Sequence, residues 1–104
     1  MFDADRRFRI VHAIRDTVNR NGGAAYPVKF RDKALLGIPD RLAEFNEEDF
    51  PDLSDSKQLL NLSSRITMFL GYMKAQNFDE AWEILKVMAA ILADRNNSLD
   101  KFSA

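Results

Sequence analysis

Apolar residues recur at helical spacing in the N-terminal part of the chain, up to a pair of glycines. One broad face of the helical wheel carries Phe8, Ile10, Val11, Ile14 and Val18. Aspartates at the start suit the positive end of a helix dipole. The run Asn21-Gly22-Gly23 then ends the pattern, because glycine readily adopts the left-handed conformation that closes a helix. The pattern predicts that residues 1–21 hold an N-terminal helix, which starts at Asp3 or Asp5 and ends at about Arg20.

Between the glycines and residue 56 the pattern breaks into short pieces. Tyr26, Val28 and Phe30 alternate with Pro27 and Lys29, which predicts an extended loop or a short β-bridge. Further along, a proline at residue 39 suits the first turn of a short helix, in which Leu42 and Phe45 are expected to face inward. Residues 46–56 form an acidic connector, through which a proline at residue 51 prevents a continuous helix. The segment 24–56 is therefore expected to consist of loop and short helices.

Residues 55–95 carry two further amphipathic helices joined by only a few residues. The first, over about 55–76, has Ser54 or Asp55 as its predicted N-cap. Its apolar stripe consists of Leu59, Leu62, Ile66, Phe69, Leu70 and Met73. The second begins at Asn77, which has the spacing of a capping box with Glu80, and runs to about Arg95. A connection this short predicts an antiparallel α-hairpin, followed by a polar, frayed tail over 96–104. We expect an all-α fold: a small helical bundle, a single domain over 1–104, built on this hairpin with the N-terminal helix packed across it.

The last helix is apolar over more than half of its circumference. The residues of this wide face are Ala81, Trp82, Ile84, Leu85, Val87, Met88, Ala89, Ile91 and Leu92. A helix of this kind has to be buried on two sides. Either two other helices of the chain cover it, or a second copy of the chain does, in which case a closed homodimer is the commonest arrangement.

Composition excludes several kinds of site. The chain has no cysteine and one histidine, so disulfides, thiolate metal sites and a two-histidine metal site within the chain are excluded. His12 lies four residues before Asp16, a spacing that can orient an imidazole for acid–base catalysis, but a surface pair is the simpler interpretation. The acidic connector lacks the alternating ligands and central glycine of a calcium loop. We expect no metal, no cofactor and no catalytic site.

Charge is unevenly distributed along the chain, although the net charge is only −1. Residues 1–41 carry a charge of +4, residues 42–56 a charge of −6 and residues 57–104 a charge of +1. The acidic connector is either a solvated segment or a surface for a basic partner. The basic part offers a nucleic-acid-binding surface, in which Phe30 or Tyr26 could stack on a base. The residues of this surface are Arg6, Arg9, Arg20, Lys29, Arg31 and Lys33, with Arg7 and Arg15 flanking it. Helix ion pairs from Asp5 to Arg9 and from Asp16 to Arg20 are expected to neutralise part of it.

The segment 72–85 resembles the turn and second helix of a tetratricopeptide unit. Tyr72 stands before the turn, Phe78 after it, and the small Ala81 follows in the second helix. The resemblance covers one unit, whereas a helical repeat normally needs three or more copies, and Phe69 stands where the family has a small residue. We interpret it as the sequence pattern of an α-hairpin.

The candidate partner-binding residues lie on the two hairpin helices. Met68 and Tyr72 are four residues apart, opposite the apolar stripe, with Arg65 alongside, and Trp82 lies on the wide apolar face. Met, Tyr and Arg are enriched at protein interfaces, although the N-terminal helix could instead pack over these positions. The longest apolar run, residues 87–93, is too short to cross a membrane. We predict a small, non-enzymatic, cytoplasmic binding or adaptor protein, such as a regulator or inhibitor, that docks on a protein partner or forms a homodimer. A nucleic-acid-associated protein is the alternative.

Overall fold

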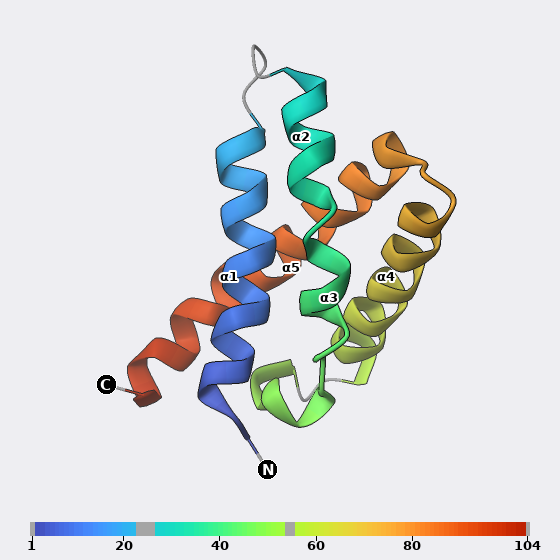
Figure 1. Ribbon diagram of the computed structural model, residues 1–104. Coiled ribbons are helices and arrows are strands. Elements are labelled where there is room, and N and C mark those ends of the chain that lie inside the picture. Colours follow the sequence, from blue (N-terminus) through green and yellow to red (C-terminus); the bar gives the residue numbers. More distant parts are fainter. Residues whose placement is uncertain (1, 23–26, 54–55, 104) are drawn as a thin grey trace.

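The computed structural model describes the backbone of residues 2–22, 27–53 and 56–103, and the side chains of these residues except 56 and 94–103. Every regular element in this part is helical, which confirms the expected all-α bundle (Figure 1). The elements are α1 (Ala4–Asn21), α2 (Val28–Leu35), α3 (Ile38–Leu42), the 3-10 helices η1 (Glu47–Asp49) and η2 (Pro51–Leu53), α4 (Ser56–Lys74) and α5 (Phe78–Ser103).

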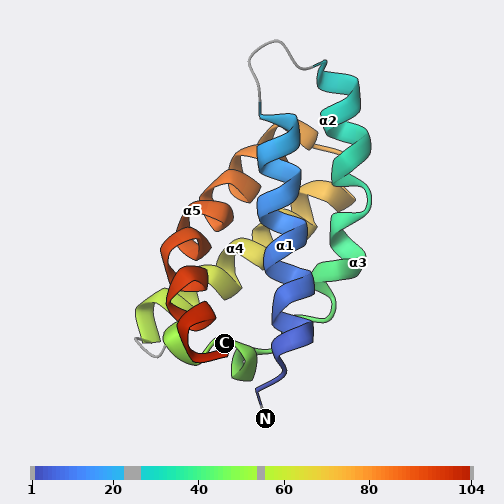
Figure 2. The ribbon, with the colours of Figure 1, turned by 90° about the vertical axis from the view of Figure 1, so that its left-hand side faces the viewer.

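The helices form two layers (Figures 1 and 2). One layer contains α1 with α2 and α3 beside it, and the other contains α4 and α5. Helix α5 packs on α4 and also on α1, so two neighbours from the same chain flank it. Its residues Ala81, Leu85, Met88 and Leu92 are fully buried. The wide apolar face is thus buried mainly within the chain, and its width is no longer an argument for a homodimer through this helix.

Helix α1 begins where the sequence predicts, but it buries a different edge of its apolar face. The Asp3 side chain caps the helix by accepting a hydrogen bond from the Arg6 N–H at 3.0 Å. Ile10 and Ile14 point into the core, whereas Phe8 is 63% exposed and Arg7 is buried in its place. The expectation for Phe8 was wrong because a neighbouring carboxylate makes burial of Arg7 favourable, as described below.

The end of α1 also differs from the expectation. Gly22 follows Asn21 with φ −92°, so it does not adopt the left-handed conformation. Glycine is needed here for space, because a Cβ atom would lie 2.6 Å from the Val18 carbonyl oxygen and 3.8 Å from the ring of Trp82. Gly23, the last residue of the run that was predicted to end the helix, lies outside the described residues, as does Tyr26.

Residues 28–35 form a helix rather than the predicted extended loop. Pro27 precedes it with φ −62°, a value that suits the start of a helix. The alternation of Val28 and Phe30 was misleading because both side chains are exposed, at 55% and 48%. The buried residue of α2 is Leu35. Helix α3 follows at once, with its proline in the first turn as predicted.

The connection between α4 and α5 is closed by backbone hydrogen bonds. The N–H of Asn77 donates to the Tyr72 oxygen at 2.8 Å and that of Gln76 to the Met73 oxygen at 3.0 Å. This is a Schellman motif, and it places Gln76 at a left-handed φ of 59°. Asn77 then caps α5, as predicted, with its Oδ1 3.5 Å from the N–H of Glu80.

The end of α5 and the start of α4 were both predicted from the sequence. Helix α5 continues to Ser103, so the expected frayed tail over 96–104 was wrong for the backbone. Neither glycine nor proline follows Arg95, and nothing in the sequence therefore breaks the helix. The predicted N-cap of α4, at Ser54 or Asp55, lies outside the described residues.

Candidate protein-docking groove

The basic N-terminal helix and the acidic connector meet at one end of the molecule. The fully buried carboxylate of Asp49 accepts hydrogen bonds from Arg6 Nε at 2.5 Å, Arg6 Nη2 at 2.9 Å and the Asp3 N–H at 2.9 Å. The Arg6 guanidinium, helped by the Asp3 N–H, lowers the pKa of Asp49 below its ordinary value of 3.8 although burial opposes this shift. A buried carboxylate thus stays ionised because its charge is matched.

Arg7 makes a second contact of this kind. It is 3% exposed and donates to both carboxylate oxygens of Asp52, at 2.9 and 3.1 Å, and to the backbone oxygen of Asp49 at 3.1 Å. Its guanidinium carbon also lies 4.7 Å from the ring centre of Phe50, which in turn lies 5.3 Å from that of Phe45. We name Arg6, Arg7, Asp49 and Asp52 the ionic clamp. The clamp fixes the connector on α1 and so positions Phe45.

A hollow of about 610 Å³ lies beside the clamp, between α3, η1 and α4. We name it the α3–α4 groove; it is lined by Leu42, Phe45, Asn46, Glu47, Glu48, Ser63, Ile66 and Thr67. Leu42 and Ile66 are buried and Phe45 is half-buried, which gives the groove an apolar floor. Glu47 and Glu48 are exposed at its edge. The groove thus combines an apolar floor with a negatively charged rim.

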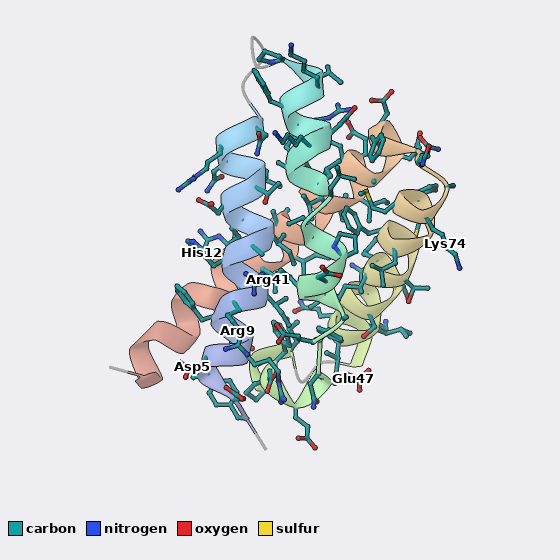
Figure 3. All side chains as sticks on the ribbon, in the orientation of Figure 1. Asp5, Arg9, His12, Arg41, Glu47 and Lys74 are labelled. Carbon is teal, nitrogen blue, oxygen red and sulfur yellow. The ribbon has the colours of Figure 1, made fainter. Side chains whose placement is uncertain are left out.

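A weak polar contact links the two walls of the groove, and a second hydrogen bond lies within α4. Ser63 Oγ donates to Glu47 Oε1 at 3.5 Å, across from α4 to η1, and the Thr67 hydroxyl donates to the Ser63 backbone oxygen at 3.2 Å. Figure 3 shows Glu47 on the same side of the molecule as α4. The rim therefore presents carboxylates and hydroxyl groups, which are groups that bind by hydrogen bonding and charge.

The predicted nucleic-acid-binding residues do not form one continuous basic surface. Arg6 belongs to the ionic clamp. Arg9 lies 3.6 Å from Glu44 rather than beside Asp5, and Arg20 pairs with Asp16 at 3.0 Å as predicted. Arg31 contacts two carboxylates, those of Asp32 at 2.8 Å and Asp79 at 2.6 Å. Lys29 and Lys33 are exposed on α2. Four of the six cations are thus matched by carboxylates of the chain.

The predicted partner-binding residues separate into two places. Arg65 Nη1 lies 3.7 Å from the sulfur of Met68, which is 38% exposed, and Tyr72 is half-buried on the same helix. Trp82 is 6% exposed and lies under Arg31, whose guanidinium carbon is 5.8 Å from its ring centre. The side chain of Trp82 is thus covered by α2 and lies apart from the surface around Met68 on α4.

His12 is exposed on α1, far from the groove (Figure 3). Its ring stacks on Phe8, with ring centres 5.2 Å apart, and no hydrogen bond joins it to Asp16 in the described part of the chain. Phe8 and His12 line a small hollow of about 170 Å³. The predicted His–Asp pair is thus replaced by an aromatic stack.

The groove was not found from the sequence, although two signals pointed to its surroundings. The opposite charges of residues 1–41 and 42–56 anticipate the ionic clamp. The predicted inward orientation of Leu42 and Phe45 is confirmed in part, because Leu42 is buried whereas Phe45 remains half-open to the groove. Which helix lies opposite these side chains depends on packing that no local pattern specifies.

The described residues contain neither a metal site nor a membrane-spanning helix. Among the described residues, no group of three His, Asp or Glu side chains is arranged to hold a metal ion. None of the helices in the described ranges has the length and apolar character required to cross a bilayer. No model of a known protein family matches the sequence, and neither a curated protein nor a solved structure shows significant similarity to it.

Proposed function

We propose that this protein is a non-enzymatic binding or adaptor protein that acts through protein–protein contacts, and that its partner docks in the α3–α4 groove. The observation that carries the proposal is the half-buried ring of Phe45, packed beside the buried Leu42 and Ile66 and lying beneath the carboxylates of Glu47 and Glu48. An apolar centre within a polar rim is the usual anatomy of a protein interface. Docking on such a surface would regulate or inhibit the partner, and we propose the cytoplasm as the compartment, which cell fractionation tests.

The rigidity of the groove supports this proposal. Its floor rests on Phe50, which is 1% exposed and lies between Phe45 and the Arg7 guanidinium. A preformed surface loses little conformational entropy when it binds. The second candidate surface, around Arg65 and Met68, lies on α4, where Met68 is 38% exposed and Tyr72 is half-buried.

Two arginine substitutions on α4 distinguish these surfaces. Thr67 is exposed and lines the groove, whereas Ser64 is exposed one turn from Met68 and does not line it. The immobilised wild type should capture proteins from a lysate of the source organism. The immobilised Thr67→Arg variant should no longer capture them, whereas the Ser64→Arg variant should still do so. Loss on Ser64→Arg alone would assign docking to the Met68 surface, and retention by both variants would refute docking in the groove.

One observation favours nucleic-acid binding as a second candidate. Lys29 and Lys33 are exposed on α2, and Lys29 Nζ lies 5.4 Å from the ring centre of the exposed Phe30. Lysines beside an aromatic ring are typical of single-stranded nucleic-acid-binding surfaces. In gel-shift experiments at low salt, Lys29→Glu with Lys33→Glu should abolish the binding of RNA or DNA. If the wild type shifts neither, this candidate is wrong.

A further inference from the structure

Helix α2 presents a surface of unusual composition to solvent. The exposed side chains of its outer face are Lys29, Phe30, Lys33 and Leu36. Phe30 is 48% and Leu36 62% exposed, so both apolar groups are open to contact. The nearby carboxylate of Asp32 points to Arg31 and does not neutralise the lysines. We name these four residues the α2 face; it is apolar and positively charged.

The α3–α4 groove is the complement of the α2 face. The groove offers an apolar floor and two carboxylates, those of Glu47 and Glu48, whereas the α2 face offers two apolar side chains and two ammonium groups. Arg6 is directed to Asp49 and Arg7 to Asp52, and the charge of Glu48 also acts on Arg6, so Glu47 is the carboxylate that mainly carries the complementarity. Charge complementarity of this kind steers association and fixes the register of an interface.

The two surfaces of one molecule cannot meet each other. Figures 1 and 2 show α2 at one end of the molecule and η1 at the other end. The groove is lined by residues of η1 and therefore lies away from α2. Helix α2 is also fixed in place, because Arg31 joins it to Asp79 of α5 at 2.6 Å and Leu35 is fully buried. The α2 face therefore reaches a groove only in a second molecule.

We propose that the α3–α4 groove binds the α2 face of a second copy of this chain. In this arrangement, Phe30 and Leu36 contact the apolar floor while Lys29 and Lys33 meet Glu47 and Glu48. The proposal rests on the proposed function in one respect, which is that the groove is a docking site. Self-association then occupies the groove that another partner would use, and the two are in competition.

Charge reversal on each surface tests the proposal in the full-length protein. Two variants are made: Lys29→Glu with Lys33→Glu, and Glu47→Lys with Glu48→Lys. When two molecules of the same variant meet, the α2 face of one and the groove of the other carry charges of the same sign. Each variant should therefore weaken self-association by about a hundredfold or more. The wild type should associate in sedimentation velocity over about 1 μM to 1 mM, and added salt should weaken this association.

Mixing the two reversed variants provides the decisive measurement. The mixture brings the basic α2 face of one variant to the acidic groove of the other, and the acidic α2 face to the basic groove. Association should therefore return in the mixture although neither variant associates alone. Lys74→Glu with Lys86→Glu is the control for the variant Lys29→Glu with Lys33→Glu, since it makes the same change in net charge. Its two lysines are exposed and lie outside both surfaces, so it should leave association unchanged.

The outcomes separate this proposal from the proposed function. A wild type that stays monomeric over the whole concentration range overturns self-docking, as does a mixture that fails to associate. If the groove then still captures another protein in a manner that Thr67→Arg abolishes, docking in the groove stands and only the second copy is refuted. If neither association nor capture depends on the groove, both proposals are wrong. Circular dichroism of each variant confirms that the helical fold is kept.

Discussion

Replacing Arg7 by methionine removes a buried charge whose partner is almost as buried as Arg7 itself. The side chains of Arg7 and Asp52 are only 4% and 10% exposed, and two hydrogen bonds join them. The variant Arg7→Met keeps an apolar side chain over Phe50 but leaves the Asp52 carboxylate and the Asp49 backbone oxygen without their donor. The test thus isolates the electrostatic part of the contact.

The expected loss of stability follows from this burial. Removing one partner of a buried ion pair costs about 3–5 kcal/mol, because the other charge remains uncompensated. The residual exposure of Asp52 places the cost near the lower limit, at about 3 kcal/mol. In a domain of this size such a loss lowers Tm by about 12–20 °C. It is also a large part of the total free energy of unfolding, which is about 5–15 kcal/mol for a typical domain.

Thermal and urea unfolding, followed by circular dichroism, measure this loss. The matched control is Arg20→Met on the same helix, whose partner Asp16 is at the surface, so the change should cost less than about 0.5 kcal/mol. The double variant Arg7→Met with Asp52→Leu should recover most of the lost stability, since no buried charge is then left alone. Equal effects of the two Arg→Met changes, or strictly additive effects in the double variant, would refute the account of the clamp.

Three other predictions concern single positions. Gly22→Ala should destabilise the protein by about 1–3 kcal/mol in urea unfolding, because the new Cβ would clash with a backbone oxygen, whereas Gly37→Ala, where the added Cβ has no neighbour within 4 Å, should be nearly neutral. Gln76→Gly should raise Tm, with a gain of up to about 1 kcal/mol, since glycine adopts the left-handed conformation of the α4–α5 connection without strain; an unchanged or lower Tm would contradict this. Because the pKa of Asp49 is lowered in the folded state, its stabilising contribution is complete above the ordinary value of 3.8 and declines as the pH falls further. Asp49→Asn should therefore be less stable at neutral pH and should lose less stability than the wild type on acidification, which a series of unfolding curves from neutral to acidic pH would show.

The long helices could be predicted from the sequence because their signals are local. The spacing of apolar residues in α1, α4 and α5 identifies a helix wherever it packs, and Asp3 and Asn77 mark helix starts through hydrogen bonds to their own neighbours. The segment charges separate a basic N-terminal part from an acidic connector, although the contact between the two was not predicted. These properties depend on residues within a few positions of one another or on the net charge of a segment.

The choice of which residues are buried was decided by tertiary structure. The periodicity of α1 allows either Phe8 or Arg7 at the edge of the buried face, and the sequence favoured Phe8. Arg7 is buried because Asp52, 45 positions away in the chain, supplies the matching charge. In the same way, Trp82 is covered only because Arg31 of α2 lies over it, which no spacing within α5 could reveal.

The α3–α4 groove has the same origin. Leu42, Phe45 and Ile66 read locally as ordinary core residues, and the sequence gives no sign that a hollow is left between them. The sequence by itself determined the all-α fold, the three long helices and the separation of charge, since each follows from short-range periodicity and capping. Only the tertiary structure decided the buried edge of α1, the ionic clamp and the groove, because each depends on contacts between residues that lie far apart along the chain.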